Sequence, residues 1–421
     1  MNFLKVIRRF WFRVKSIIMA KNYKTPGIYV EEMPKFPPSV YSVGTAIPAF
    51  IGYTEKAQRT EPGDLLNVPA RISSLIEYEL YFGKGAALSA GEEVNNFYMY
   101  NSLRLFFANG GGICFIVSTG LYDSSVKVAG DFTLDGKGLH AIEKTDEVTL
   151  LVLPDNTLLS TGNDFYDVYD AALEQCGRLL DRFVIMHVKE NDPKGLEFRN
   201  YIGIQSLNYG AAYTPWLQIN PAGSQKTVTV PPDGAIAGIY AAVDQNRGVW
   251  KAPANVSING IIGPKDAFTS HEQEALNIDE AGGKSINVIR SFAGKGTLVW
   301  GARTLAGNDN EWRYVNVRRF FIFVEESVKK ATEQYVFEPN EPNTWVKVQA
   351  MIENFLSTLW RQGALQGSKP EHAYYVAVGL GKTMTQLDIL EGRMIVEIGM
   401  AAVKPAEFII LRYSIKMITG Q

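Results

Sequence analysis

The amino-acid sequence predicts a mixed α/β protein in which helices flank a central sheet. Apolar runs at 147–153 and 183–188 have the composition of buried strands, and a helical pattern at 164–180 lies between them. Strand, helix and strand in this order are typical of parallel strands in an α/β core. Apolar residues also recur at helical spacing through 317–335. The chain has 421 residues, enough for about two or three domains.

The N-terminal part of the body is predicted to begin as an extended arm. Thr25-Pro26-Gly27 signals a turn, and three prolines between residues 34 and 38 exclude regular structure. The short extended run between them consists of Ile28, Tyr29, Val30 and Glu31. The further elements expected before residue 190 are strands at 46–53, 113–117, 147–153 and 183–188 and helices at 95–108 and 164–180. Glycine and proline are frequent through 215–264, which predicts long ordered loops there.

The C-terminal third has the clearest periodicity. One predicted helix, at 317–335, places a face of apolar residues opposite the charged residues Arg318, Glu325, Glu326 and Lys329. A second helix is expected to open near Asn343 or Thr344 and to end at Gly363. Two strands should follow, at 394–400 and at 408–417. The apolar side of the last strand consists of Ile409, Leu411, Tyr413, Ile415 and Met417.

Composition and charge exclude several classes of protein. With 46% hydrophobic and 20% charged residues, the chain can offset the entropy of ordering and is predicted to be globular. The 42 basic residues nearly balance the 44 acidic ones, which argues against a nucleic-acid binder. No apolar run approaches the roughly 18 residues that span a bilayer. The two cysteines, Cys114 and Cys176, are expected to be buried and inert.

Residues 1–18 differ from the remainder, because they contain five basic residues and no acidic one. Their apolar residues recur at helical spacing, so a basic amphipathic helix on a membrane surface is one interpretation. A disordered or helical arm is another. A third is that Met19 is the true start and the preceding codons are an annotation artefact.

Motifs for catalysis are incomplete. Gly283-Lys284-Ser285 and Gly381-Lys382-Thr383 imitate a phosphate-binding loop, but Ile278 and Val376 occupy the positions that require glycine. His271-Glu272 begins like a zinc-protease helix, but the second histidine position is Ala275. We therefore expect no cofactor, no metal and no catalytic residue. An α/β enzyme or a membrane-surface module without a recognisable motif remains the alternative.

Several ordered blocks resemble contractile tail sheath proteins. The sequence at 25–32 and at 45–52 looks like the N-terminal signature of that family, and 231–255 resembles its central block. Two further stretches resemble the family as well: Val299-Trp300-Gly301-Ala302-Arg303-Thr304 and residues 314–319. The match is completed near the C-terminus by Pro405-Ala406-Glu407-Phe408-Ile409. The resemblance covers nearly everything after Met19 and includes the phage-tail-like branch of injection systems and R-type particles.

The resemblance implies a sheath-protein fold and a structural role. Such subunits stack as hexameric rings around an inner tube, and the sleeve shortens to drive the tube through a target envelope. The expected partners are further copies, the inner tube protein, and baseplate and tail-terminator proteins, with no nucleic acid and no direct membrane insertion. Assembly is expected in the bacterial cytoplasm, within a phage tail or a released particle. The expected segments are a basic extension at 1–18, arms at 19–45 and 404–421, an α/β body at 46–285 and a sheath domain at 286–403.

The termini also favour assembly on physical grounds. A long terminal strand such as 408–417 presents unpaired backbone groups, which must pair with the chain's own sheet or with a partner. Spacing alone leaves these two possibilities open, and the resemblance favours donation to a neighbour. Four charged residues are further candidates for contacts between subunits: Arg318, Arg319, Glu325 and Glu326. One of the helices at 317–335 and 348–359 is our expectation for the tube-facing element, although both should be mostly core.

Overall fold

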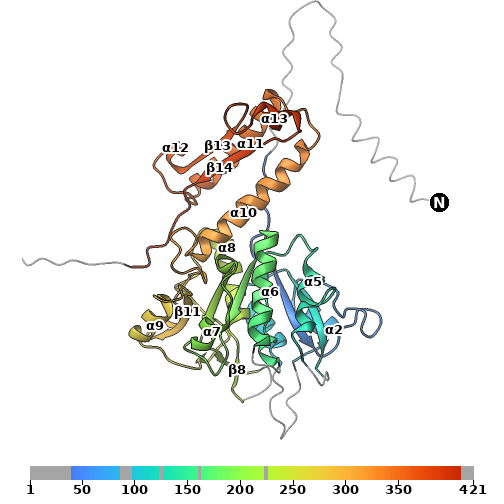
Figure 1. Ribbon diagram of the computed structural model, residues 1–421. Helices are drawn as coiled ribbons and strands as arrows, with labels where there is room; N and C mark the ends of the chain where they lie inside the picture. Colours follow the sequence, from blue (N-terminus) through green and yellow to red (C-terminus); the bar gives the residue numbers. More distant parts are fainter. Residues whose placement is uncertain (1–38, 86–96, 123–126, 160–162, 222–225, 409–421) are drawn as a thin grey trace, which may run out of the picture. The chain divides into compact units, whose positions relative to one another are not determined.

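A nine-stranded mixed sheet forms the centre of the protein. The structure is a computed structural model that describes residues 39–85, 97–122, 127–159, 163–221 and 226–408 (Figure 1). The strands follow the order β2-β3-β1-β4-β5-β6-β11-β12-β9. Their bounds are β1 Pro48–Thr54, β2 Ala70–Ile72, β3 Cys114–Leu121, β4 Leu150–Val152, β5 Phe183–His187, β6 Gly210–Thr214, β9 Val256–Ser257, β11 Ile286–Phe292 and β12 Gly296–Val299.

The interior strands of this sheet are parallel. The run from β3 through β1, β4, β5 and β6 to β11 is parallel throughout, whereas β2, β12 and β9 join the ends in antiparallel fashion. Leu151 of β4 pairs with Ala49 of β1 on one side and Val184 of β5 on the other. The prediction of a parallel α/β core from the strand, helix and strand at 147–188 is therefore confirmed.

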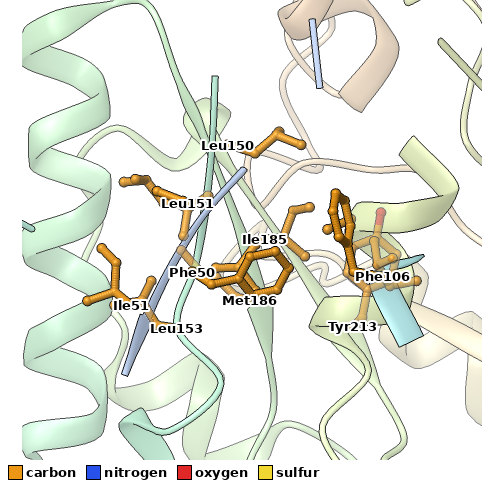
Figure 2. Packing of buried hydrophobic residues seen from close by; sticks show 14 of the residues in the cluster. Phe50, Ile51, Phe106, Leu150, Leu151, Leu153, Ile185, Met186 and Tyr213 are labelled. Carbon is orange, nitrogen blue, oxygen red and sulfur yellow. The ribbon is translucent and has the colours of Figure 1, made fainter. Parts of the chain in front are cut away.

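Helices pack against the sheet because its strands are apolar on both faces. In Figure 1, α6 lies along the near face. Leu173 of α6 contacts Gly210 of β6, where an added Cβ would approach it to 2.7 Å. Phe50 of β1 points the other way and meets Phe106 of α3 edge-on, with ring centroids 5.3 Å apart; both rings are among the packed residues of Figure 2. The helices of this part are α2 Leu75–Phe82, α3 Met99–Ala108, α4 Gly130–Thr133, α5 Gly138–Ile142, α6 Asp164–Leu179, α7 Leu196–Tyr201, α8 Asp233–Arg247 and α9 Ser270–Asn277.

The prediction of long loops through 215–264 was wrong. The fifteen-residue helix α8 occupies the centre of this stretch, and β7 (Leu217–Ile219), β8 (Val228–Val230) and β10 (Gly263–Pro264) form a small antiparallel sheet. Pro232 stands at the helix start, where proline is tolerated because its missing N–H would have no partner. Gly234 and Gly238 lie against the backbone of α3, where a Cβ would clash. The two glycines allow close packing of the helices. Composition alone does not distinguish such glycines from those of a loop.

The C-terminal part has a hydrophobic cluster of its own. Phe320, Phe323 and Val324 of α10 pack with Val348 and Ile352 of α11 in this cluster. Val315 and Ile322 of α10 belong instead to the cluster of the central sheet. The elements are α10 Val315–Thr332, α11 Pro342–Arg361, α12 Pro370–Ala373, β13 Tyr374–Val378, α13 Gln386–Leu390 and β14 Val396–Met400.

Two expectations for this part are corrected by the structure. The helix α11 starts at Pro342 with Glu341 as its N-cap residue, two residues before the expected cap at Asn343 or Thr344. The expected boundary between residues 285 and 286 cuts the central sheet, because β11 pairs with β6. The helices at 317–335 and 348–359 and the strand at 394–400 agree with prediction.

Most of each predicted arm lies outside the described residues. This applies to Ile28, Tyr29, Val30 and Glu31 at one end and to Ile409, Leu411, Tyr413, Ile415 and Met417 at the other. The structure does describe the residues that adjoin them, and these are the starting point for the candidate site.

Candidate intersubunit surfaces

The N-terminal root, residues 39–47, is held against α10 and the central sheet. The Val43 amide donates to Ser327 Oγ at 3.3 Å, and the Ile47 amide donates to Thr149 Oγ1 at 2.9 Å. Between them, the Thr45 carbonyl accepts from Arg319 Nη2 at 2.8 Å. Three hydrogen bonds over five residues thus fix the chain where the N-terminal arm would join the body.

Arg319 is the buried centre of this root. Its guanidinium is 2.6 Å from Asp244 of α8, and the two side chains are 3% and 5% exposed. It also lies over the Tyr240 ring, 4.6 Å from the centroid. A buried ion pair needs further hydrogen bonds to offset the loss of water, and the Thr45 carbonyl supplies one.

The C-terminal root, residues 403–408, is anchored by an ion pair of Glu407. Arg303 donates to both carboxylate oxygens, at 2.9 and 2.6 Å, and Asn277 Nδ2 and Tyr314 Oη add bonds of 2.8 and 3.1 Å. Burial by itself would raise the pKa of Glu407. The hydrogen bonds from Arg303 and Asn277 outweigh it, so the pKa lies below its ordinary value.

Backbone contacts extend this anchor upstream. Asn316, in the first turn of α10, donates to the carbonyls of Val403 at 3.0 Å and Trp250 at 2.8 Å. Lys404 Nζ donates to the Asn310 carbonyl at 2.8 Å. Phe408, the last residue before the region outside the description, is 66% exposed. The two roots therefore contact the same helix, the C-terminal root at Asn316 and the N-terminal root at Arg319 and Ser327.

The four charged residues predicted for intersubunit contacts are paired within the chain. Arg318 is buried, bonds Glu325 at 2.8 Å and lies over the Trp312 ring. Arg319 bonds Asp244 as described. Glu326 is also buried; its Oε1 accepts from Lys329, whereas its Oε2 has no partner among the described residues. The charged face of this helix is thus largely internal, and contacts between these residues and a second chain stay a prediction.

The C-terminal part also contains a small sheet with unpaired edges. Among the described residues, β13 and β14 pair only with each other, in antiparallel register from Tyr374↔Met400 to Val378↔Val396. Their burial is incomplete, and Tyr375 is 53% exposed. A two-stranded sheet is marginally stable in water, and its outer edges can accept further strands.

The motifs that imitate catalytic sites have structural roles. Lys284 is buried and its Nζ donates to the carbonyls of Arg199 and Ile202, near the end of α7. Thr383 donates to the Ile395 carbonyl. Cys114 and Cys176 are buried and free, and burial raises both thiol pKa values. Among the described residues, no group of His, Cys, Asp and Glu side chains could hold a metal ion.

One polar cluster was not foreseen from the sequence. His187 Nδ1 lies 3.1 Å from Asp233 and 3.0 Å from Tyr169 Oη, and all three side chains are buried where β5 ends. Nearby, burial raises the pKa of Asp155 to about 7, although the amides of Tyr98 and Tyr53 donate to its carboxylate. No local spacing signals this cluster, because His187 is 18 residues from Tyr169 and 46 residues from Asp233.

No helix in the described part of the chain has both the length and the apolar composition required to cross a membrane.

The fold and these surfaces define a structural subunit of a contractile sheath. Family models for the phage tail sheath protein central domain and the phage tail sheath C-terminal domain match residues 181–305 and 307–416. The chain belongs to the phage tail sheath family. It is therefore a structural protein and not an enzyme.

Solved structures resemble the chain over nearly its whole length. A chain in the six-fold symmetrised baseplate of the anti-feeding prophage is 36% identical with a TM-score of 0.71, covering 94% of this chain and 100% of that one. A chain in the contracted sheath complex of PVC, an extracellular contractile injection system, is 38% identical with a TM-score of 0.71, covering 93% and 98%. The mixed α/β sheath fold expected from the sequence is thereby confirmed.

The curated relatives match over shorter regions. The tail sheath protein of Vibrio phage KVP40 is 27% identical over 140 residues, which is 32% of this chain and 20% of that protein. A prophage major tail sheath protein of Pseudomonas aeruginosa is 28% identical over 156 residues, 36% of this chain and 39% of that protein. The aligned part of the chain thus spans about a fifth to two fifths of the length of these relatives.

Proposed function

We propose that this protein polymerises as stacked hexameric rings around an inner tube and shortens to drive the tube through a target envelope. Neighbouring copies stay joined because each donates its terminal arms to the others. The observation that carries this proposal is the pair of anchored roots together with the unpaired edges of β13 and β14. Each arm would join the body at a fixed point, and the body offers sheet edges that can receive a strand.

The small sheet is the acceptor that the structure favours. Main-chain hydrogen bonds to β13 or β14 would supply affinity, and alternate side chains would set the register. The C-terminal arm has the alternating pattern for this role, with apolar residues at the five alternate positions Ile409, Leu411, Tyr413, Ile415 and Met417. The N-terminal run from Ile28 to Glu31 is the second candidate strand. We extend the proposal to the two arms expected above, at 19–45 and 404–421.

The similar solved structures support the assembly and its contracted state. The anti-feeding prophage sheath and the PVC sheath have both been observed contracted, and the related baseplate chain lies in a six-fold symmetrised assembly. Two packings that differ by a few kcal/mol per subunit suffice to drive contraction, because the differences add along the polymer. Further partners under this proposal are the inner tube, baseplate and tail-terminator proteins. The particle would be assembled in a bacterial cytoplasm and act in a phage tail or after release.

Truncation after Pro405 tests strand donation. The shortened chain should remain folded and soluble, because it retains every residue of the two hydrophobic clusters, but it should form no sleeves in negative-stain electron microscopy. It loses the Glu407 anchor as well, so a second truncation after Phe408, which retains that anchor, isolates the arm. A chain that begins at Met19 is the matched control and should polymerise. Sleeves of normal length from the chain that ends at Phe408 would count decisively against donation of the C-terminal strand.

A further inference from the structure

An exposed phenylalanine occupies a conformation that favours glycine. The Glu338 amide donates to the Tyr335 carbonyl at 3.1 Å, and Val336, at φ −63° and ψ 130°, precedes Phe337 at φ +70°. These are the features of a type II turn, whose third position requires a positive φ and normally carries glycine. The side chain of Phe337 is fully exposed, at 102% of its reference area, and Val336 is 60% exposed. The chain thus holds a large apolar side chain in water on a strained backbone.

Acidic residues surround this turn. Glu333, Glu338 and Glu341 are exposed, and none of them forms a salt bridge within the described part of the chain. We call residues 333–341 the Phe337 turn. It combines one projecting apolar side chain with unpaired negative charge. Such a surface suits a partner that offers an apolar pocket and positive charge.

A groove near the other end of α10 has that character. Its volume is about 950 Å³, and it is lined by Trp250 and Trp300 together with the residues that start α10. Four basic residues face it: Arg247, Lys251, Arg290 and Lys404. None of the four forms a salt bridge with a described residue, and burial together with the nearby Arg247 lowers the pKa of Lys251. Of the two acids in the lining, Glu407 is neutralised by Arg303.

We propose that the Phe337 turn of one copy docks into this groove of a second copy. Phe337 would pack between the two tryptophans, and the glutamates of the turn would meet Arg247 and Lys251. Pockets of about 300–1,000 Å³ enclose drug-sized ligands, so the groove is large enough for one aromatic ring and the residues beside it.

The occupant must come from another molecule. Tyr314 and Asn316 of the groove precede or begin α10, whereas the Phe337 turn follows its end. The helix has 18 residues and separates the two sites by about 27 Å, at 1.5 Å per residue. A contact between two different surfaces of identical copies closes into a ring or propagates as an open chain, depending on the rotation that relates the copies. The inference rests on the proposed polymerisation, and adds to it a contact that does not involve the arms.

Reciprocal charge reversal tests this contact. One variant carries Glu338→Lys and Glu341→Lys, and another carries Arg247→Glu and Lys251→Glu. Each should raise the protein concentration needed for polymer formation, measured by sedimentation and electron microscopy, by about tenfold or more. The chain that carries all four substitutions should return that concentration toward the original value. A fourfold variant no better than either double variant would overturn the contact.

Phe337→Gly separates docking from folding. Glycine suits the third position of a type II turn, so the melting temperature of the monomer should stay the same or rise, while the concentration needed for polymers rises as in the charge variants. Ile204→Ala removes another exposed apolar side chain, remote in sequence from the Phe337 turn, and should change neither the melting temperature nor that concentration. Normal polymers from Phe337→Gly would overturn the inference. The inference would also be overturned if Arg247→Glu and Lys251→Glu left the concentration needed for polymer formation unchanged. The groove would then bind a different occupant, such as the segment after Phe408 or the inner tube. Failure of the unsubstituted chain to polymerise would overturn the proposed function itself and this inference with it.

Discussion

The two roots differ in what holds them. The N-terminal root is bonded through its backbone, and the charge beneath it, Arg319, already has a buried partner in Asp244. The C-terminal root supplies a charge of its own, because Glu407 is half of the ion pair with Arg303. Glu407 is 21% exposed, whereas Asp244 is 5% exposed.

This difference indicates how each root can be released. Freeing the N-terminal root requires its hydrogen bonds to be broken and Val40 and Val43 to leave the cluster against which they pack, but the Arg319–Asp244 pair can stay intact. Freeing the C-terminal root breaks an ion pair and leaves Arg303, which is 4% exposed, without its main partner. We therefore expect the C-terminal arm to stay fixed to its own body during contraction, and the N-terminal root to be the point that yields.

The largest effect is expected for Arg319→Met. The substitution leaves Asp244 buried without a partner and should lower the free energy of unfolding by about 3–5 kcal/mol. Chemical denaturation of the unassembled chain measures this loss. Arg178→Met is the matched control, since the pair with Glu143 is half exposed and should contribute at most about 1 kcal/mol. Equal losses in the two variants would show that burial of the Arg319 pair has been overstated.

A smaller loss, about 2 kcal/mol, is expected for Glu407→Gln. The amide removes the charge from a hydrogen-bonded pair that water partly reaches. The effect should be local, so that hydrogen exchange increases at 403–408 and not at 39–47. Glu311→Gln, which changes an exposed acid without a salt bridge among the described residues, should leave exchange at both roots unaltered. Faster exchange at both roots in Glu407→Gln would show that they open together.

Acid should weaken the C-terminal root selectively. The pKa of Glu407 is lowered on folding from its ordinary 4.5, so its stabilisation is fully present above about pH 4.5 and is lost as the pH falls through the folded value. The difference in unfolding free energy between the original chain and Glu407→Gln should therefore stay constant above about pH 4.5 and shrink as the pH falls below it. A difference that does not shrink in acid would exclude an ionised Glu407 as the anchor.

The smallest effect is expected for Ser327→Ala. It removes the hydroxyl that accepts from the Val43 amide at 3.3 Å, a bond that should contribute about 0.5–1 kcal/mol. Exchange of the Val43 amide should increase while stability changes little. Ser291→Ala, on an exposed strand position, is the control. Unchanged protection of Val43 would mean that the contacts of Thr45 and Ile47 suffice to hold the N-terminal root.

Local patterns predicted those parts of the fold that depend on local chemistry. The helix expected at 164–180 is observed as α6, because its apolar stripe and the strands beside it form one continuous signal. Sequence patterns failed to predict the elements whose structure depends on tertiary packing. Helix α8 was missed because Pro231, Pro232 and Gly234 read as a loop, although Gly234 in fact allows contact with α3.

The roots could not have been found in this way. Thr45 and Arg319 are 274 residues apart, Asp244 and Arg319 are 75 apart, and Arg303 and Glu407 are 104 apart. Helical periodicity placed Arg318 and Glu326 on a polar face, whereas tertiary packing buries both. Only the resemblance to sheath proteins drew attention to residues 45–52 and 405–409, and it did so without indicating what holds them.

Helix α10 also fixes the distance between the two roots. Asn316 contacts the C-terminal root and Ser327 contacts the N-terminal root. These two residues are eleven positions apart, which is about 16 Å along a helix. The helix lends residues to both hydrophobic clusters, so stretching or bending it would disturb two cores at once. The distance between the two roots is therefore the same in every copy. A sleeve made of such copies would change its length by rotation of whole subunits, and the distance between the roots within each subunit would not change.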